Sequence, residues 1–349
     1  MSRASRARRI AVAAAYGGGG LGLLGAATAG VVFTETKLAR RSIGEPTGEP
    51  PVADGTYGDR NGRPALQLAL LGDSSAAGLG VHDPLETPGA LLAHALSEVA
   101  ERPVRLSNVA KSGAVSADLK DQVRRVLDTP LTPHVAVIMI GTNDVTHRVR
   151  ATVAVRHLDQ AVRQLRAASV EVVVGTCPDL GTVRPMAQPL RLIARRLSRM
   201  LAAAQTIVCV EAGARVVSLG DLLGPEFAAA PHLLFGPDRF HPSAAGYATC
   251  TYALMPAACE ALGLWPEPAG VRGPLEMAEL ADLAEPVLPV ADAAAEAAEN
   301  PGSEVTGVQV AGQDRGPRGR WARLRLRRTP RITVLEPPGT VALSVAAEE

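Results

Sequence analysis

The sequence is poor in aromatic residues and has almost no net charge. Aromatic side chains make up 3% of its 349 residues, and the formal net charge at pH 7 is +1. Proteins that bind nucleic acids usually rely on basic patches and on aromatic rings that stack on bases. The sequence also has no Gly-Lys-Ser/Thr phosphate loop, and the stretch from Gly78 lacks the third glycine of a dinucleotide-binding turn. Neither nucleic acids nor nucleotides are therefore expected as partners.

Cysteine is also scarce, and the four cysteines lie too far apart for a Cys-x-x-Cys redox or zinc motif. We interpret them as small buried apolar side chains, although in an exported protein a disulfide such as Cys250–Cys259 would be feasible. No group of His, Asp and Glu has the spacing of metal ligands. The sequence thus predicts neither a metal nor a cofactor.

Charged residues are missing from the run between Ile10 and Phe33, which follows an arginine-rich N-terminus. This run of about 24 residues can span a bilayer, which takes roughly 20. Ala27-Thr28-Ala29 also offers a cleavage site of the small-x-small type. Residues 1–41 are therefore either an uncleaved signal anchor, which we favour, or a signal peptide. Both predict an exported protein, held at the cell membrane or secreted, because the arginines keep the N-terminus in the cytoplasm.

Composition divides the remaining chain into three parts. Residues 42–64 are rich in Pro, Gly and acidic residues and predict a linker. Residues 65–265 alternate short apolar runs with amphipathic segments and predict one folded domain. Residues 266–349 predict a low-complexity, disordered tail that is first acidic and then rich in arginine. Its arginine-rich part is either a solvated tail or a segment that binds anionic lipid.

Short, β-branched apolar runs within the domain predict strands that are buried on both faces of a parallel sheet. They begin near residues 65, 104, 134, 170 and 214. Apolar residues at helical spacing predict helices over residues 88–101, 116–127, 151–168, 190–204 and 242–262. Strands that alternate with helices indicate an α/β fold, here a three-layer α/β/α sandwich with a five-stranded parallel sheet. Such sheets bind ligands at the carboxyl ends of their strands.

The stretch "LALLGDSSAAGLG", which begins at Leu68, ends the first predicted strand in Gly72-Asp73-Ser74. Ser74 is thus expected at the edge of the sheet where ligands bind. A serine hydroxyl becomes an effective nucleophile only when a base accepts its proton. The residue after Ser75 is Ala76, which excludes the Gly-x-Ser-x-Gly elbow of α/β-hydrolases.

One of the seven histidines, His241, has the neighbourhood that such a base requires. The others lie inside predicted helices, at the wrong end of a strand, close behind the first strand, or in loops without a distinctive neighbourhood. His241 lies between the last strand and the last helix, and Asp238 precedes it by three residues. A turn of irregular chain can bring this carboxylate to Nδ1 and so direct Nε2 towards the serine.

Two further strand ends offer hydrogen-bond donors for an oxyanion. Gly113 follows the second strand and can present an unobstructed backbone N–H. Asn143 follows the third strand and carries a side-chain NH₂ group. The backbone N–H of Ser74 is a third candidate. Asp73 and Asp144 are interpreted as turn and capping residues.

Four sequence blocks at these strand ends resemble those of the SGNH hydrolases, the GDSL-type esterases and lipases. The blocks are Gly72-Asp73-Ser74, Gly113, Gly141-x-Asn143-Asp144 and Asp238-x-x-His241. The resemblance covers residues 65–265 and implies the flavodoxin-like SGNH hydrolase fold. It also implies a nucleophile, its general base and acid, the carboxylate that orients this base, and an oxyanion hole. Ser74 is the implied nucleophile, His241 the implied general base and acid, and Asp238 the implied orienting carboxylate. Ser74, Gly113 and Asn143 are the implied residues of the oxyanion hole.

Ser75 departs from the family pattern, whose name has leucine at this position. The change removes no catalytic group, but it alters the side chain next to the nucleophile and so affects the shape of the acyl pocket.

The residues and the resemblance together predict a serine esterase that hydrolyses short-chain acyl or lipid esters through an acyl-enzyme. One alternative is a deacetylase or acyltransferase of cell-envelope glycans, and another is a non-catalytic envelope scaffold, against which the intact Ser/Asp/His set argues. The expected partners are a small-molecule or lipid ester and, through the N-terminal segment, the membrane. Short connections leave little room for a lid and few aromatic residues can stack on sugars, so we favour short acyl groups.

Overall fold

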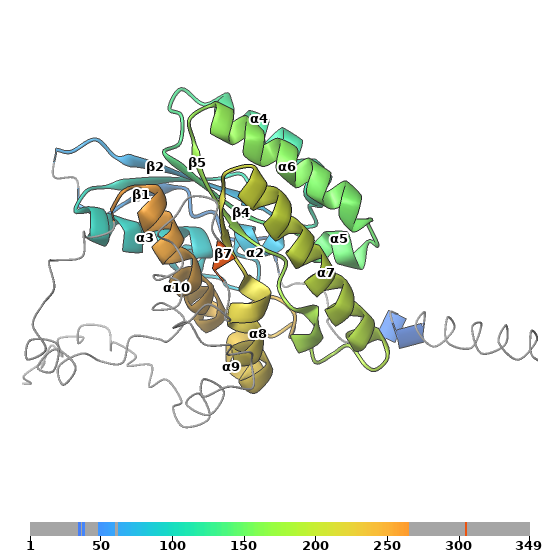
Figure 1. The fold of residues 1–349 in the computed structure, drawn as a ribbon. Helices are drawn as coiled ribbons and strands as arrows, with labels where there is room; N and C mark the ends of the chain where they lie inside the picture. Colours follow the sequence, from blue (N-terminus) through green and yellow to red (C-terminus); the bar gives the residue numbers. More distant parts are fainter. Residues whose placement is uncertain (1–33, 36, 39–47, 60–61, 265–303, 306–349) are drawn as a thin grey trace, which may run out of the picture.

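A computed structural model describes residues 34–35, 37–38, 48–59, 62–264 and 304–305 (Figure 1). Its centre is a seven-stranded sheet with the order β1-β3-β2-β4-β5-β6-β7. The strands are β1 (Gly55–Tyr57), β2 (Leu66–Gly72), β3 (Val104–Asn108), β4 (Val135–Met139), β5 (Glu171–Gly175), β6 (Arg215–Val217) and β7 (Glu304–Val305). Neighbouring strands pair in parallel, except that β1 runs antiparallel to β3.

The inner strands, β2 to β6, confirm the predicted α/β fold with its parallel sheet. Each begins within a residue of the position expected from the apolar runs. Their order, β3-β2-β4-β5-β6, is the flavodoxin-like arrangement, in which the direction of winding reverses beside the first parallel strand. Ligands of such sheets bind at this reversal, and it lies at the carboxyl end of β2, directly before Ser74.

The two edge strands were not predicted. β1 lies in the segment that composition predicts as a linker, where Gly55 pairs with Leu106. β7 lies in the predicted tail, and Glu304 pairs with Val216 of β6. β6 is equally short but was predicted from the apolar run that begins near residue 214, whereas β1 and β7 have neither such a run nor enough residues to show the alternation of side chains.

Helices cover both faces of the sheet (Figure 1). They are α2 (Ser74–Ala77), α3 (Pro88–Ala100), α4 (Leu119–Leu127), α5 (Thr142–Thr146), α6 (Ala151–Ala167), α7 (Leu190–Glu211), α8 (Leu219–Ala229), α9 (Pro231–Leu234) and α10 (Ala244–Ala261), with short 3₁₀ turns at Pro84–Glu86, Ser116–Asp118 and Leu180–Thr182. Leu68 and Leu70 of β2 pack in one core with α3, α8 and α10. Ala69 and Leu71 point to the other face and pack in a second core with α4, α6 and α7.

Four of these helices, α2, α5, α8 and α9, were not predicted, and the last two lie between β6 and the His241 loop. Gly220, Gly224 and Pro225 within α8 interrupt the pattern of a helix in the sequence. The predicted helix at residue 190 is also longer than expected and continues to Glu211. The remaining predicted helices end within two residues of the expected positions.

Within the part of the chain that the structure describes, no helix is long and apolar enough to cross a bilayer. The run from Ile10 to Phe33 lies outside the described residues, as does nearly all of the tail after residue 264. Export, the membrane anchor and lipid binding by the arginine-rich segment therefore stay predictions from the sequence.

Candidate active site

Ser74 and His241 come together at the carboxyl edge of the sheet, although 167 residues separate them in the chain. Ser74 is the first residue of α2, directly after β2, and His241 lies shortly before α10. His241 Nε2 is 3.0 Å from Ser74 Oγ, within hydrogen-bonding distance. Both residues are buried, with 6% and 7% of their surfaces exposed. The geometry therefore lets the imidazole accept the serine proton.

Asp238 binds the other side of the imidazole. Its Oδ2 is 2.5 Å from His241 Nδ1, and its Oδ1 accepts the backbone N–H groups of Phe240 at 2.9 Å and His241 at 3.0 Å. Burial acts to raise the pKa of Asp238, but these hydrogen bonds outweigh it, and the pKa lies below its usual value. An ionised Asp238 holds the proton of His241 on Nδ1 and leaves Nε2 free to face Ser74.

The loop of His241 packs closely against the chain that follows Ser74. A Cβ atom on Gly80 would lie 2.7 Å from the carbonyl oxygen of Pro242 and 3.0 Å from Cβ of His241, so only glycine permits this approach. The hydroxyl of Tyr247 on α10 donates to the carbonyl of Leu79 at 2.6 Å. Together these contacts hold the two loops of the Ser74–His241 pair in place.

A buried glutamine that sequence reasoning missed fixes the strand end before Ser74. Gln122 of α4 accepts the N–H of Gly72 at 2.7 Å and donates to its carbonyl at 2.9 Å. Gly72 has φ of 138°, and a Cβ atom there would lie 1.9 Å from the carbonyl oxygen of Met139 on β4. The signal in the sequence was a polar residue on the apolar face of a predicted helix, which needs a buried partner.

The predicted oxyanion residues lie on the other side of Ser74. Asn143 Nδ2 donates to the carbonyl of Ala114 at 3.0 Å, which holds the Gly113 loop next to the Asn143 side chain. Asp144 accepts the hydroxyl of Ser116 at 2.9 Å and its N–H at 3.1 Å, and so holds the same loop. The amide of Asn143 has a second hydrogen, which its bond to Ala114 leaves available to a ligand.

Gly113 itself is exposed and has φ of 79°. No atom lies within 4 Å of a Cβ built there, so the backbone conformation, and not a lack of space, favours glycine at this position. The structure thus brings the Gly113 loop, Asn143 and Ser74 to one edge of the sheet, after β3, β4 and β2.

Asp73 lies between the His241 loop and the Gly113 loop, and only 1% of its surface is exposed. Burial raises its pKa to about 6, even though Oδ1 accepts the N–H of Ser75 at 3.0 Å. As predicted, it has the geometry of a helix N-cap, here for α2. Its other carboxyl oxygen, Oδ2, is buried and has no hydrogen-bond partner among the described residues.

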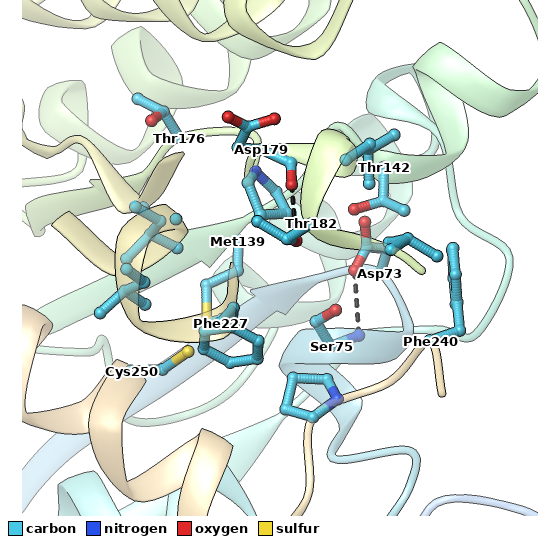
Figure 2. A pocket seen from close by; sticks show the side chains of 18 of the residues that line it. Asp73, Ser75, Met139, Thr142, Thr176, Asp179, Thr182, Phe227, Phe240 and Cys250 are labelled. Atoms are coloured by element: carbon cyan, nitrogen blue, oxygen red, sulfur yellow. Dashed lines mark hydrogen bonds between the residues drawn. The ribbon is translucent and has the colours of Figure 1, made fainter. Parts of the chain in front are cut away.

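The side chains beside Ser74 and His241 line an apolar cavity of about 80 Å³ (Figure 2). Asp73 and Ser75 come from the turn after β2, and Phe240 from the His241 loop. Phe227 of α8 and Cys250 of α10 lie across the cavity. The ring of Phe240 also meets that of His241 edge-on, with 5.0 Å between the ring centres.

All four cysteines are buried and unpaired, so the feasible Cys250–Cys259 disulfide does not form. Their role as small buried side chains matches the default interpretation. In the described part of the chain, no group of His, Cys, Asp and Glu is arranged to hold a metal ion.

Comparisons with known proteins point to one family. Residues 70–249 match the GDSL-like lipase/acylhydrolase family. The GDSL-like esterase Rv1075c of Mycobacterium tuberculosis is 39% identical over 263 residues, which cover 72% of this chain and 83% of that protein. Two solved structures are more distant. The lipase Lip_vut3 from a goat rumen metagenome is 17% identical, with a TM-score of 0.43, and the match covers 54% of this chain and 94% of that one. For the acetylxylan esterase Axe2 of Geobacillus stearothermophilus the identity is 21%, the TM-score 0.41 and the coverage 57% and 94%. The chain belongs to the GDSL-like lipase/acylhydrolase family and is a serine hydrolase that acts on ester bonds.

Proposed function

We propose that Ser74, His241 and Asp238 hydrolyse carboxylic esters through an acyl-enzyme. The observation that carries the proposal is the chain of short contacts from Ser74 Oγ through the imidazole to the carboxylate of Asp238. A base in this position can take the serine proton as the hydroxyl attacks. No metal or cofactor is needed for this chemistry.

In the first step Ser74 Oγ attacks the ester carbonyl carbon, and its proton moves to His241 Nε2. The carbonyl oxygen becomes an oxyanion, which accepts hydrogen bonds from the backbone N–H groups of Ser74 and Gly113 and from Asn143 Nδ2. As the tetrahedral intermediate collapses, the C–O bond to the alcohol breaks. His241 then gives its proton to the leaving alcohol, and the acyl group stays on Ser74.

In the second step water attacks the acyl-enzyme, with His241 Nε2 as the base. The acid is released and the proton returns to Ser74 Oγ. The negative charge of Asp238 stabilises the imidazolium that forms in both steps. Because its pKa is held below the usual value, Asp238 stays ionised throughout the neutral range.

For the substrate we propose carboxylic esters of short acyl groups. The apolar lining of the cavity beside Ser75 supports an acyl chain in preference to a sugar ring. Lipid esters and acetylated cell-envelope glycans are the alternatives from the sequence. A panel of p-nitrophenyl esters, a lysophospholipid and an acetylated glycan separates them, and faster deacetylation of the glycan would overturn the proposal.

Replacing Ser74 by alanine tests the nucleophile. We expect Ser74→Ala to lose at least about 10⁴-fold in kcat for p-nitrophenyl acetate, and to lose all covalent labelling by a fluorophosphonate probe. Ser169→Gly is the matched control, because Ser169 precedes β5 at the opposite edge of the sheet and its φ of 61° suits glycine. A Ser74→Ala protein that is folded, still labelled and still active would contradict the assignment.

A further inference from the structure

The apolar cavity adjoins both Ser74 and His241. Ser75 follows Ser74, and Phe240 and Pro242 flank His241, and all three line the cavity. An acyl group on Ser74 Oγ with its oxygen towards Asn143 would have its chain close to this opening. The far wall is apolar and consists chiefly of α8, with Leu219, Leu223 and Phe227.

Ser75 keeps the near side of this cavity open. Its side chain is half-buried, and it stands where the name of the family has leucine. A leucine side chain is larger by two heavy atoms and would extend into the cavity from the turn that carries the nucleophile. The space beside Ser74 thus follows from the residue at position 75.

We propose that this cavity binds the acyl chain of the ester and that Ser75, by its small size, sets the acyl lengths that the enzyme accepts. The proposal rests on Ser74 as the nucleophile. The cavity is small, about 80 Å³, and its lining is apolar, which favours a short acyl chain over a long one. The substrates expected to fit the cavity are esters of short acyl chains, such as butyrate.

The test fills the cavity from its near side. We expect Ser75→Leu to lower kcat/KM for p-nitrophenyl butyrate at least about tenfold relative to the acetate, since each buried methylene contributes roughly fourfold. Ser75→Ala keeps the cavity open and is expected to keep the wild-type ratio of butyrate to acetate. The alcohol is the same throughout, so a change in this ratio reports on the acyl chain alone.

A second variant acts on the far wall and covers the case in which Ser75→Leu fails to fold. Phe227→Leu enlarges the cavity, and we expect it to raise kcat/KM for the octanoate relative to the butyrate at least about threefold. Unchanged ratios in the folded variants would overturn the proposal. So would a change that appears only when the alcohol is varied at constant acyl group, because the cavity would then hold the alcohol.

These outcomes are separate from those that test the nucleophile. If Ser74→Ala keeps its activity, the proposed function fails and the acyl cavity with it. If Ser74→Ala is inactive and the position-75 and position-227 variants keep the wild-type ratios, only the acyl cavity is wrong.

Discussion

The loop that carries His241 and the loop that carries Gly113 flank Ser74 from opposite sides, but they are built differently. In the His241 loop, Asp238 accepts two backbone N–H groups and the imidazole, and the carbonyl of His241 accepts the N–H of Gly236 at 2.8 Å. The Gly113 loop is exposed at its tip and has one backbone hydrogen bond of its own, from the N–H of Ala114 to the carbonyl of Lys111 at 3.1 Å, and Asn143 and Asp144 of α5 hold it from outside.

This difference separates two tasks. In the proposed mechanism the base has to be oriented before the substrate arrives, and the His241 loop achieves this with bonds of its own. The oxyanion donors have to stay free for a group that exists only during the reaction. Asn143 meets both demands, because one amide hydrogen fixes its orientation on Ala114 while the other remains available.

The largest loss of kcat is expected from replacing Asp238, which binds the proposed base. Asp238→Asn keeps an oxygen that can accept the N–H groups of Phe240 and His241, but it places an NH₂ group against Nδ1. The wrong tautomer of His241 is then favoured, and we expect kcat to fall roughly 10³- to 10⁴-fold. Steady-state kinetics on p-nitrophenyl butyrate measures the loss, and a melting temperature near that of the wild type shows that the loop is intact. A loss below about tenfold would mean that Asp238 does not orient the base.

A smaller effect is expected from the oxyanion side. Asn143→Ala removes one donor to the oxyanion, which typically lowers kcat by about 10²- to 10³-fold and leaves KM little changed. The variant also loosens the Gly113 loop, so Ser116→Ala serves as the control, since it cuts the hydroxyl bond to Asp144 and leaves Asn143 in place. Equal losses in the two variants would assign Asn143 a purely structural role.

The smallest effect on rate is expected at Asp73, between the two sides. Asp73→Asn keeps the acceptor for the Ser75 N–H, and we expect kcat/KM to fall by less than about tenfold. Its effect on stability depends on pH. The folded protein holds the Asp73 proton up to a pKa of about 6, whereas the unfolded chain releases it near 3.8.

The free energy of unfolding that Asp73 contributes is therefore fully present below pH 3.8 and is lost as the pH rises through about 6. A change of this size in pKa corresponds to about 3 kcal/mol. Relative to the wild type, Asp73→Asn should gain about this much stability between pH 3.5 and pH 8, as measured by urea unfolding. A difference between the two proteins that does not vary with pH would show that Asp73 is ionised even when buried.

Much of the fold was predictable because its strands and helices have regular patterns of several turns or pleats. The β2 run before Ser74 and the amphipathic pattern of α6 are examples. α8 escaped prediction, because Gly224 and Pro225 weaken its pattern and packing on the sheet stabilises it instead. β1 and β7 exist only through their pairing with β3 and β6, which is not visible in two or three residues.

The residues of the site likewise divide into those that the sequence predicts and those that it does not. The proximity of Ser74, His241 and Asp238 was predictable, because the proposed roles of nucleophile, base and orienting carboxylate need particular residue types at strand ends. Gln122 and Tyr247 were not, because their role depends on the backbone groups that they meet across the fold.

By itself the sequence determined the order of strands and helices and the residue types at the strand ends, because both depend on local periodicity and on chemistry close along the chain. Only the tertiary structure decided that Asp73 is buried and has a raised pKa, while Asp238, with three donors, stays charged. It also decided that the space beside Ser75 remains open, because α8 closes the far wall of the cavity and does not fill it. Burial, hydrogen bonding and cavity shape depend on residues far apart in the chain, and packing alone brings them together.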